Sequence, residues 1–245
     1  MHTSASCTTS WDDGHPLDHR VADLLAKYGL TGTFYVPLDN FLPVMTAAEI
    51  RQLSETFEVG AHTTHHVVLT DVPGQLAEGE IRESKKRLED FTGRPCEVFC
   101  FPKGRFRRSH LEMVRRAGFR CVRTAELLST GFPVRRAGID LIPTTVQAVP
   151  RHWTAYVRNC AKRLAVRNMI LFATRVRSLS WTETAHAMLR VVAKEGGVFH
   201  LWGHSWEIEE QRQWPQLESV FREMQQWQSI APCVPNSKLA SLAQS

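Results

Sequence analysis

The stretch TTSWDDGH, residues 8–15, decides how the chain is interpreted, because it places two adjacent carboxylates, Asp12 and Asp13, between a strand-like segment and a glycine. Side chains alternate between the two faces of a strand, so neighbouring Asp residues cannot both be routine solvent contacts there. Gly14 lets the backbone turn, which can bring both carboxylates to one site. An ordinary Asp-Gly turn is the first explanation for the stretch taken alone. The rest of the chain must decide between a turn and a site.

The overall composition is that of a soluble globular protein. The chain has 245 residues, of which 43% are hydrophobic and 22% charged, so one α/β domain of barrel size, residues 1–245, accounts for all of it. A net charge of +5 does not by itself indicate nucleic acid. No apolar run is long enough to span a bilayer, and MHTSASC lacks the features of a secretion signal, so we expect a cytoplasmic protein or a chain trimmed of its leader. The six cysteines form no C-x-x-C pair, which favours free thiols in a reducing compartment.

Strand-like and helix-like segments alternate along the chain. Apolar spacing predicts helices over residues 17–28, 44–57, 73–91, 108–119, about 182–195 and 212–228, and strands over residues 31–37, 57–63, 96–104, 120–124 and 197–206. Repeated βα units imply a parallel sheet with helices outside it. The predicted fold is α/β, a distorted or incomplete (β/α) barrel of about seven parallel strands.

Polar side chains gather where the predicted strands end. Besides the two aspartates, these are His62, Lys103 in a Pro-Lys-Gly turn, Arg123 and His204. Function in such folds is located at the carboxyl ends of the strands, so these side chains are predicted to share one site.

The segment GAHTTHH contains two histidines, His62 and His66, that are four residues apart. Two imidazoles and one carboxylate are a typical ligand set for a catalytic divalent metal that keeps positions open for water and substrate. A pair of histidines in an exposed loop is the competing explanation. The Asp12-Asp13 pair at the end of another strand favours the metal.

Four motifs resemble those of the polysaccharide deacetylases of the NodB-homology type, carbohydrate esterase family 4. They are TSWDDG at 9–14, HTTHH at 62–66, CFPKG at 100–104 and HLWGHSWE at 200–207, and their order matches over roughly residues 6 to 210. The first two motifs together are specific, and the other two are weaker.

The resemblance implies a metal-dependent hydrolase that removes N-linked acetyl groups from an amino-sugar substrate, whether a glycan, a lipid-linked sugar or a small sugar. It implies one divalent metal ion, zinc by preference, bound by Asp13, His62 and His66. It makes Asp12 the general base on the water, and His204 the acid that protonates the leaving amine. The backbone N–H near Lys103 would hold the oxyanion, and Thr63 would steady the histidine loop.

This chain departs from the family pattern at three places. The third motif usually begins with an Arg that orients the base, and here that residue is Cys100. Arg123, at the end of the next strand, can replace it, although a surface Arg is an equal alternative. Lys103 stands where an aromatic residue is usual and can contact an acidic group of the substrate. Trp202 can stack on a sugar, although core packing is the commoner role of Trp.

Two further assignments concern histidines. In the segment VFHLWGHSW, His204 is nearest the catalytic end of the strand and His200 is predicted to pack inside the barrel. His65 is expected to lie beside the ligands or to face solvent.

The span from Leu141 to Thr182 contains no Asp or Glu. Three explanations are open: a solvated helix on the barrel wall, a basic amphipathic helix that touches anionic membrane lipid, or, more weakly, a nucleic-acid contact, for which no motif is present. Its basic residues are Arg151, Arg158, Lys162, Arg163, Arg167, Arg175 and Arg177.

Two other functions are compatible with the same scaffold. One is hydrolysis of an amide that is not an acetylated sugar, and the other is a barrel that binds glycan without turnover. The joint presence of Asp12, Asp13, His62 and His66 argues against simple binding, which needs no base beside a metal.

Overall fold

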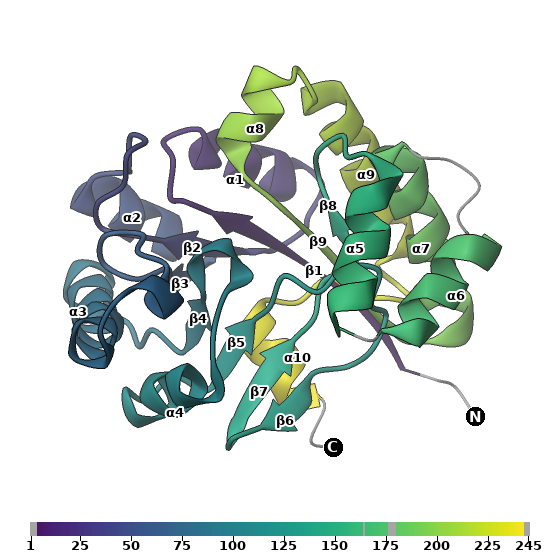
Figure 1. Cartoon of the computed structure of the whole chain (residues 1–245). Helices are drawn as coiled ribbons and strands as arrows, with labels where there is room; N and C mark the ends of the chain where they lie inside the picture. Colours follow the sequence, from purple (N-terminus) through teal and green to yellow (C-terminus); the bar gives the residue numbers. More distant parts are fainter. Residues whose placement is uncertain (1–3, 164, 176–179, 243–245) are drawn as a thin grey trace.

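The chain folds around one curved nine-stranded sheet with the strand order β6-β7-β5-β4-β3-β2-β1-β9-β8 (Figure 1). The structure is a computed structural model that describes residues 4–163, 165–175 and 180–242. The strands are β1 (Ala5–Asp12), β2 (Thr33–Val36), β3 (Glu58–Ala61), β4 (Val98–Cys100), β5 (Cys121–Arg123), β6 (Val134–Arg136), β7 (Ile139–Ile142), β8 (Val146–Gln147) and β9 (Gly197–Gly203).

Helices cover the outside of the sheet, as the βα alternation predicted (Figure 1). The helices of the described chain are α1 (Asp18–Lys27), α2 (Ala47–Ser54), α3 (Gly74–Thr92), α4 (Arg108–Arg116), α5 (Trp153–Arg163), α6 (Val166–Arg175), α7 (Trp181–Glu195), α8 (Ser205–Glu210), α9 (Trp214–Trp227) and α10 (Asn236–Leu242), of which α5 lies at the mouth of the barrel and α10 inside it. The sequence sets several of their ends. Thr46 and Glu49 form a complete capping box at the start of α2, and Gly93 ends α3 in the left-handed conformation that glycine adopts without strain.

The sheet is an open barrel. All of its strand pairs run parallel except β6 with β7, and within the described residues no pairing joins β6 to β8, the two edge strands. The expected distorted or incomplete barrel is therefore confirmed, with nine strands where about seven were predicted. The strand β6 escaped prediction because it is only three exposed residues long, and a two-residue turn at Ala137 and Gly138, both with positive φ, pairs it with β7.

The two faces of β1 show where the core and the site lie. Trp11 points outward into the helical layer, where its ring meets Phe221 edge-on at a centroid distance of 6.2 Å. Because strand side chains alternate, Ser10 and Asp12 point inward. Ser10 bonds His200 inside the barrel, and Asp12 ends the strand at the mouth of the barrel.

The C-terminal segment closes the inside of the barrel at the end opposite the site. The helix α10 contacts β1, β5 and β7, and Leu239 is fully buried in a cluster that includes Tyr35 and Val98. The amide of Asn236 donates to the Tyr35 hydroxyl at 2.9 Å, and its oxygen accepts from Thr8 at 3.0 Å. Neither α10 nor the short helix α8 was predicted.

All six cysteines are free thiols, as expected. Among the described residues, no helix is both long enough and apolar enough to cross a membrane.

Candidate active site

The carboxyl ends of the strands open into a cavity of about 560 Å³. It is lined by the predicted polar residues at the ends of β1, β3, β5 and β9, by the loop after β4, and by one face of α5. Asp12, Asp13, His62, His66 and His204 all reach it, which is the gathering expected for strand ends in an α/β barrel. Three of the seven non-glycine residues with positive φ in the described part of the chain, Asp13, His66 and Lys103, also line it.

The Asp-Asp-Gly stretch is both a turn and a site. Asp12 is the last residue of β1, and Asp13 and Gly14 then take φ values of 79° and 58°, so the chain reverses and both carboxylates face the cavity. A Cβ on Gly14 would lie 2.6 Å from Val36 Cγ1. Both the backbone conformation and the space therefore require glycine at this position.

Asp13, His62 and His66 form a group that fits a metal ion. One ligand atom from each lies within 4.8 Å of the others, and Asp13 Oδ1 is 3.2 Å from His66 Nε2 and 3.8 Å from His62 Nε2. Asp13 Oδ1 is buried and has no hydrogen-bond partner among the described residues, which is a costly state for a carboxylate oxygen without a cation. One carboxylate and two imidazoles suit a divalent ion such as zinc and leave coordination positions open.

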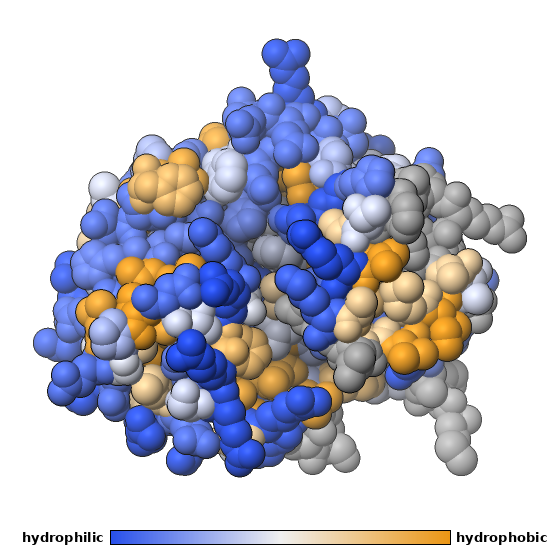
Figure 2. Space-filling view, in the orientation of Figure 1, coloured by the Kyte–Doolittle hydropathy of each residue, from blue (hydrophilic) through white to orange (hydrophobic). Residues whose placement is uncertain are grey.

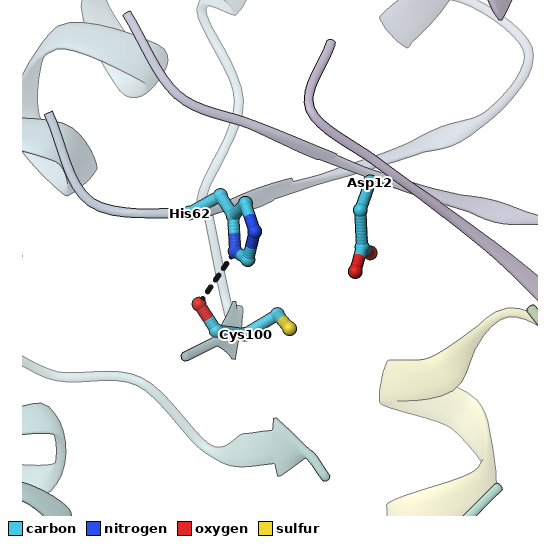
Figure 3. Close-up of side chains that lie close together, drawn as sticks. All are labelled: Asp12, His62 and Cys100. Atoms are coloured by element: carbon cyan, nitrogen blue, oxygen red, sulfur yellow. Dashed lines mark hydrogen bonds between the residues drawn. The ribbon is translucent and has the colours of Figure 1, made fainter. Parts of the chain in front are cut away.

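The protonation of His62 suits ligation. Its Nδ1–H donates to the Cys100 carbonyl at 2.8 Å, which leaves the Nε2 lone pair toward the cavity (Figure 3). Burial lowers the pKa of His62 to about 4, so the ring is neutral at neutral pH. Asp12, His62 and Cys100 form a second close group, but burial raises the pKa of the Cys100 thiol, which keeps it protonated and a poor ligand.

The loop that carries His66 is held by two side chains. Thr63 Oγ1 accepts the Val67 N–H at 3.1 Å. The buried carboxylate of Glu80 on α3 accepts the N–H groups of Thr64 and His65 and also binds His65 Nδ1 at 2.6 Å. His65 therefore faces Glu80 and lies outside the close group of ligand atoms. Glu80 was not predicted from the sequence, because the spacing of apolar residues in this helix indicates only which face is buried and not that a buried carboxylate holds the histidine loop.

Asp12 is paired with Arg123, whose side chain is only 1% exposed, so the surface alternative for this Arg is wrong. The Arg123 guanidinium donates to Asp12 Oδ2, while Asp12 Oδ1 makes no hydrogen bond with any described residue. Burial raises the pKa of Asp12, but Arg123, with His62 and His204, outweighs it, so the pKa lies below its ordinary value. The carboxylate is therefore ionised at neutral pH, and one of its oxygens is available.

His204 directly follows β9, which pairs with β1 on the side away from β2, and its ring approaches the two aspartates from that side. Its Nδ1 binds Glu207 at 2.6 Å, and its Nε2 lies 4.0 Å from Asp12 Oδ2 and 3.9 Å from Asp13 Oδ2. Burial lowers the pKa of His204. The hydrogen bond to Glu207 and the charges of the two aspartates raise it by more, so the net shift of this pKa is upward. Glu207 was missed, although its place three residues after His204 at the start of a helix was a usable signal.

The loop after β4 places Lys103 and Gly104 at the cavity. Lys103 has φ 55° and an exposed side chain. A Cβ on Gly104 would lie 2.5 Å from the Ala125 Cβ, so this glycine allows the loop to pack against the segment after β5.

Three aromatic and imidazole side chains near the site have distinct surroundings. Trp202 lines the cavity but is 93% buried, with the Arg123 guanidinium 4.6 Å from its ring centroid, so one face of the ring is already covered. Trp206 is half-buried and donates to Asp13 Oδ2 at 2.9 Å.

His200 is buried inside the barrel. Its Nδ1–H donates to the Pro143 carbonyl, its Nε2 accepts from Ser10, and burial lowers its pKa to about 3. His200 therefore packs inside the barrel, as expected.

The basic span folds into α5 and α6, and its charges do not share one outer surface. Arg151, Arg158 and Lys162 line the cavity, and the side chains of Arg158 and Lys162 are also exposed to solvent. Arg167 is exposed on α6. Arg163 and Arg175 lie on the two helices, and Arg177 lies outside the described residues.

Comparisons with known proteins agree with this fold and these motifs. A family model described as polysaccharide deacetylase matches residues 3–122, nearly half of the chain, which contain the first three motifs. Over these residues the chain matches the polysaccharide deacetylase family, which is the resemblance that the motifs predicted. The match indicates a hydrolase of the carbohydrate deacetylase class. No curated protein sequence gives a significant match.

Solved structures show the same fold at low sequence identity. A putative polysaccharide deacetylase from Mycobacterium smegmatis is 14% identical, covers 98% of this chain and 91% of its own, and has a TM-score of 0.69. The Xyl-CE4 domain of a multidomain xylanase from the hindgut metagenome of Trinervitermes trinervoides is 12% identical, covers 98% and 92%, and has a TM-score of 0.58. A family 4 carbohydrate esterase from Streptomyces lividans, in complex with acetate, is 13% identical, covers 93% and 89%, and has a TM-score of 0.55.

Proposed function

We propose that the protein is a metal-dependent de-N-acetylase of an amino-sugar substrate, and that residues 1–245 form one catalytic domain. The observation that carries this proposal is the division of labour between the two adjacent aspartates. Asp13 lies beside two imidazoles, those of His62 and His66, whose pKa values are lowered by burial. Asp12 is paired with Arg123 and keeps one carboxylate oxygen available. A site that only bound glycan would gain nothing from the buried, ionised Asp12 beside that group.

We assign the metal to Asp13, His62 and His66, with zinc as the ion. When bound there, it would supply an activated water at neutral pH and polarise the acetyl carbonyl. The remaining steps belong to the side chains of this chain. Asp12 accepts the proton of the attacking water, and its lowered pKa keeps it ready to do so.

The other two roles follow from position. Backbone N–H groups of the loop at Lys103 would donate to the oxygen of the acetyl group as charge develops on it. His204, oriented by Glu207 and with a raised pKa, would donate its Nε2 proton to the leaving amine. Water is thus divided between the acetyl carbon and the amine, giving acetate and a free amino sugar.

The substrate has two candidate contacts on the cavity wall. Phe41, in the loop after β2, is 81% exposed, lines the cavity and lies 6.4 Å from the His66 ring, so it offers a free ring face for a sugar. Trp202, with one face covered by Arg123, is proposed to shape the cavity more than to stack on the sugar.

Acetate release tests the proposal. The purified protein, loaded with zinc, is incubated with a panel of N-acetylated sugars in free, nucleotide-linked and lipid-linked form, and with N-acetylated amides that are not sugars. Acetate release from at least one sugar, lost in Asp12→Asn, is the expected result. Release only from non-sugar amides would identify another C–N hydrolase, and metal binding without turnover would identify a binding protein.

A peripheral membrane contact is a second proposal, supported by α6. Val166 and Ile170 are 67% and 57% exposed, and their spacing places them on one face of the helix beside the exposed Arg167. Figure 2 shows an apolar patch over this helix. Exposed aliphatic side chains next to cations are the pattern of a helix that rests on anionic lipid.

A further inference from the structure

The wall of the cavity that faces the candidate metal group is strongly cationic. Its lining residues include six cationic side chains and two carboxylates, Asp12 and Asp13. Arg123 is paired with Asp12, and Arg105 forms a bidentate ion pair with Asp71, in which both N···O distances are 3.0 Å. The other four cationic side chains of the lining are those of Lys103, Arg151, Arg158 and Lys162. Figure 2 shows strongly hydrophilic side chains beside the central hollow on the side of α5.

One face of α5 supplies most of this charge. Ala155, Arg158, Asn159 and Lys162 line the cavity, and their spacing of three, four and seven residues is that of a single helix face. The small Ala155 leaves room between them. Arg151 precedes the helix by two residues, so the N-terminal end of α5 and its partial positive charge are on the same side.

Two of these cations are exposed to solvent and lack an anionic partner in the described part of the chain. Arg158 and Lys162 form no ion pair with any described residue, and the span from Leu141 to Thr182 contains no Asp or Glu. The Arg151 Nε is buried and has no hydrogen-bond partner among the described residues. The positive charge of Arg151 helps to lower the pKa of Glu207, a carboxylate that is already bound by His204 and Gln147. An unpaired buried donor is costly unless a ligand accepts from it.

The wall is also held in place against the catalytic residues. Asn159 accepts the Leu127 N–H at 3.0 Å and donates to the Ala125 carbonyl at 2.9 Å, which fixes α5 on the segment after β5. On the adjacent side of the helix, Tyr156 and Cys160 are buried in a cluster with Trp202. The cationic face is therefore positioned relative to Arg123 and Asp12.

We infer that the substrate is an amino sugar that carries a phosphate ester, and that Arg151, Arg158 and Lys162 bind the phosphate while the acetamido group lies at the aspartates. This inference rests on the proposed function and adds the chemical class of its substrate. A phosphate group offers three acceptor oxygens and up to two charges, which several separate cations can share. A carboxylate offers two oxygens and one charge, which a single Arg satisfies.

A binding experiment that needs no turnover tests the cationic wall. Inorganic pyrophosphate is titrated into the zinc-loaded protein, into Arg158→Gln with Lys162→Gln, and into a control with the same residue changes outside the cavity, Arg167→Gln with Lys194→Gln. The cavity variant should bind pyrophosphate at least about tenfold more weakly, because each charged contact contributes that much, and the control should bind like the wild type. Equal binding by all three proteins would overturn the inference.

Turnover then identifies the source of the phosphate. Acetate release is measured with N-acetylglucosamine, its 1-phosphate, the polyprenyl diphosphate-linked sugar in detergent, and an N-acetylated disaccharide that contains a uronic acid. We expect kcat/KM for a phosphorylated sugar to exceed that for the free sugar by about tenfold or more. The cavity variant should lose this preference, and the control variant Arg167→Gln with Lys194→Gln should keep it. A preference for the lipid-linked form over the soluble phosphate would place the substrate at a membrane.

The two proposals fail in different ways. Pyrophosphate binding that depends on Arg158 and Lys162, without acetate release from any sugar, would refute the deacetylase and leave the anion site. Acetate release that is equal for free and phosphorylated sugars, or highest for the uronic acid, would refute the phosphate and leave the deacetylase.

Discussion

Cys100 on β4 and Arg123 on β5 are register partners in the parallel sheet, and the Arg123 guanidinium donates to Asp12 on β1, which is four strands away from β5. The third motif of the family begins with an Arg at the position of Cys100. Here that position carries a thiol, and the Arg that binds Asp12 comes from the neighbouring strand β5. The partner of Asp12 is therefore displaced by one strand, while the charge beside the carboxylate is the same.

Loss of this Arg should change the acidity of Asp12. In Arg123→Ala, burial is no longer opposed by the guanidinium, so the pKa of Asp12 rises and the acid limb of the kcat/KM profile moves to higher pH. Arg123→Lys should rescue kcat poorly, because Lys lacks the planar fork. The pH profiles of the three proteins are compared, with folding checked by circular dichroism. An unshifted acid limb in Arg123→Ala would leave Arg123 with a structural role alone.

Metal content depends on His66 in the proposed ligand set. Elemental analysis of the purified protein should give close to one divalent metal per chain, and His66→Ala should lose most of it. His65→Ala is the matched control, because its ring faces Glu80 and not the ligand group. Full occupancy in His66→Ala, or equal losses in the two variants, would contradict the assignment of Asp13, His62 and His66.

Asp12 is expected to act in proton transfer and not in metal binding. Asp12→Asn preserves size and leaves an acceptor for Arg123 but cannot take a proton from water. Metal content should stay at the wild-type value while kcat falls by about 10²–10⁴, the usual contribution of a general base. If kcat is close to normal at every pH, the base is another group.

Asp18, fully buried at the start of α1, should make stability depend on pH. Burial raises its pKa well above 3.8, more than the nearby Ser205 hydroxyl lowers it. Between its unfolded and folded pKa values the native state holds a proton that the unfolded state has released, so the free energy of unfolding falls as pH rises, by at most about 1.4 kcal/mol per pH unit.

Asp18→Asn removes this dependence, so it should stabilise the protein more at pH 8 than at pH 4. Chemical denaturation at both pH values measures the difference. Asp23→Asn, an exposed position on the same helix, is the control and should show the same effect at both. A larger gain at pH 4 would reverse the sign of the argument.

Membrane contact through α6 predicts binding to acidic vesicles that weakens with salt, since the Debye length falls from about 10 Å at 0.1 M to about 3 Å at 1 M. Val166→Ser with Ile170→Ser should lose most of this binding, because each buried aliphatic side chain contributes about 1.5–3 kcal/mol. Ile230→Ser changes an apolar side chain that is 50% exposed elsewhere and serves as the control. A wild-type protein that stays in the supernatant at low salt would refute the contact.

The amino-acid sequence by itself determined the alternation of strands and helices and the residues at the strand ends. Asp12, Asp13, His62 and His66 could be assigned to one site because parallel strands present their carboxyl ends on one edge of a sheet, whatever the length of chain between them. The glycines at 14 and 104 could be recognised because the backbone turns there. These inferences need only local patterns and one rule of topology.

Only the tertiary structure decided which side chains meet across the sheet and above it. That Arg123 reaches Asp12 depends on the order of the strands in the sheet, and the sequence left a surface Arg equally open. The charges of α5 face the cavity because Asn159, Tyr156 and Cys160 fix its rotation, whereas its sequence allowed solvent or lipid. The physical reason is the same in both cases: contacts between residues distant in sequence are set by packing, and packing leaves little trace in the local pattern of the chain.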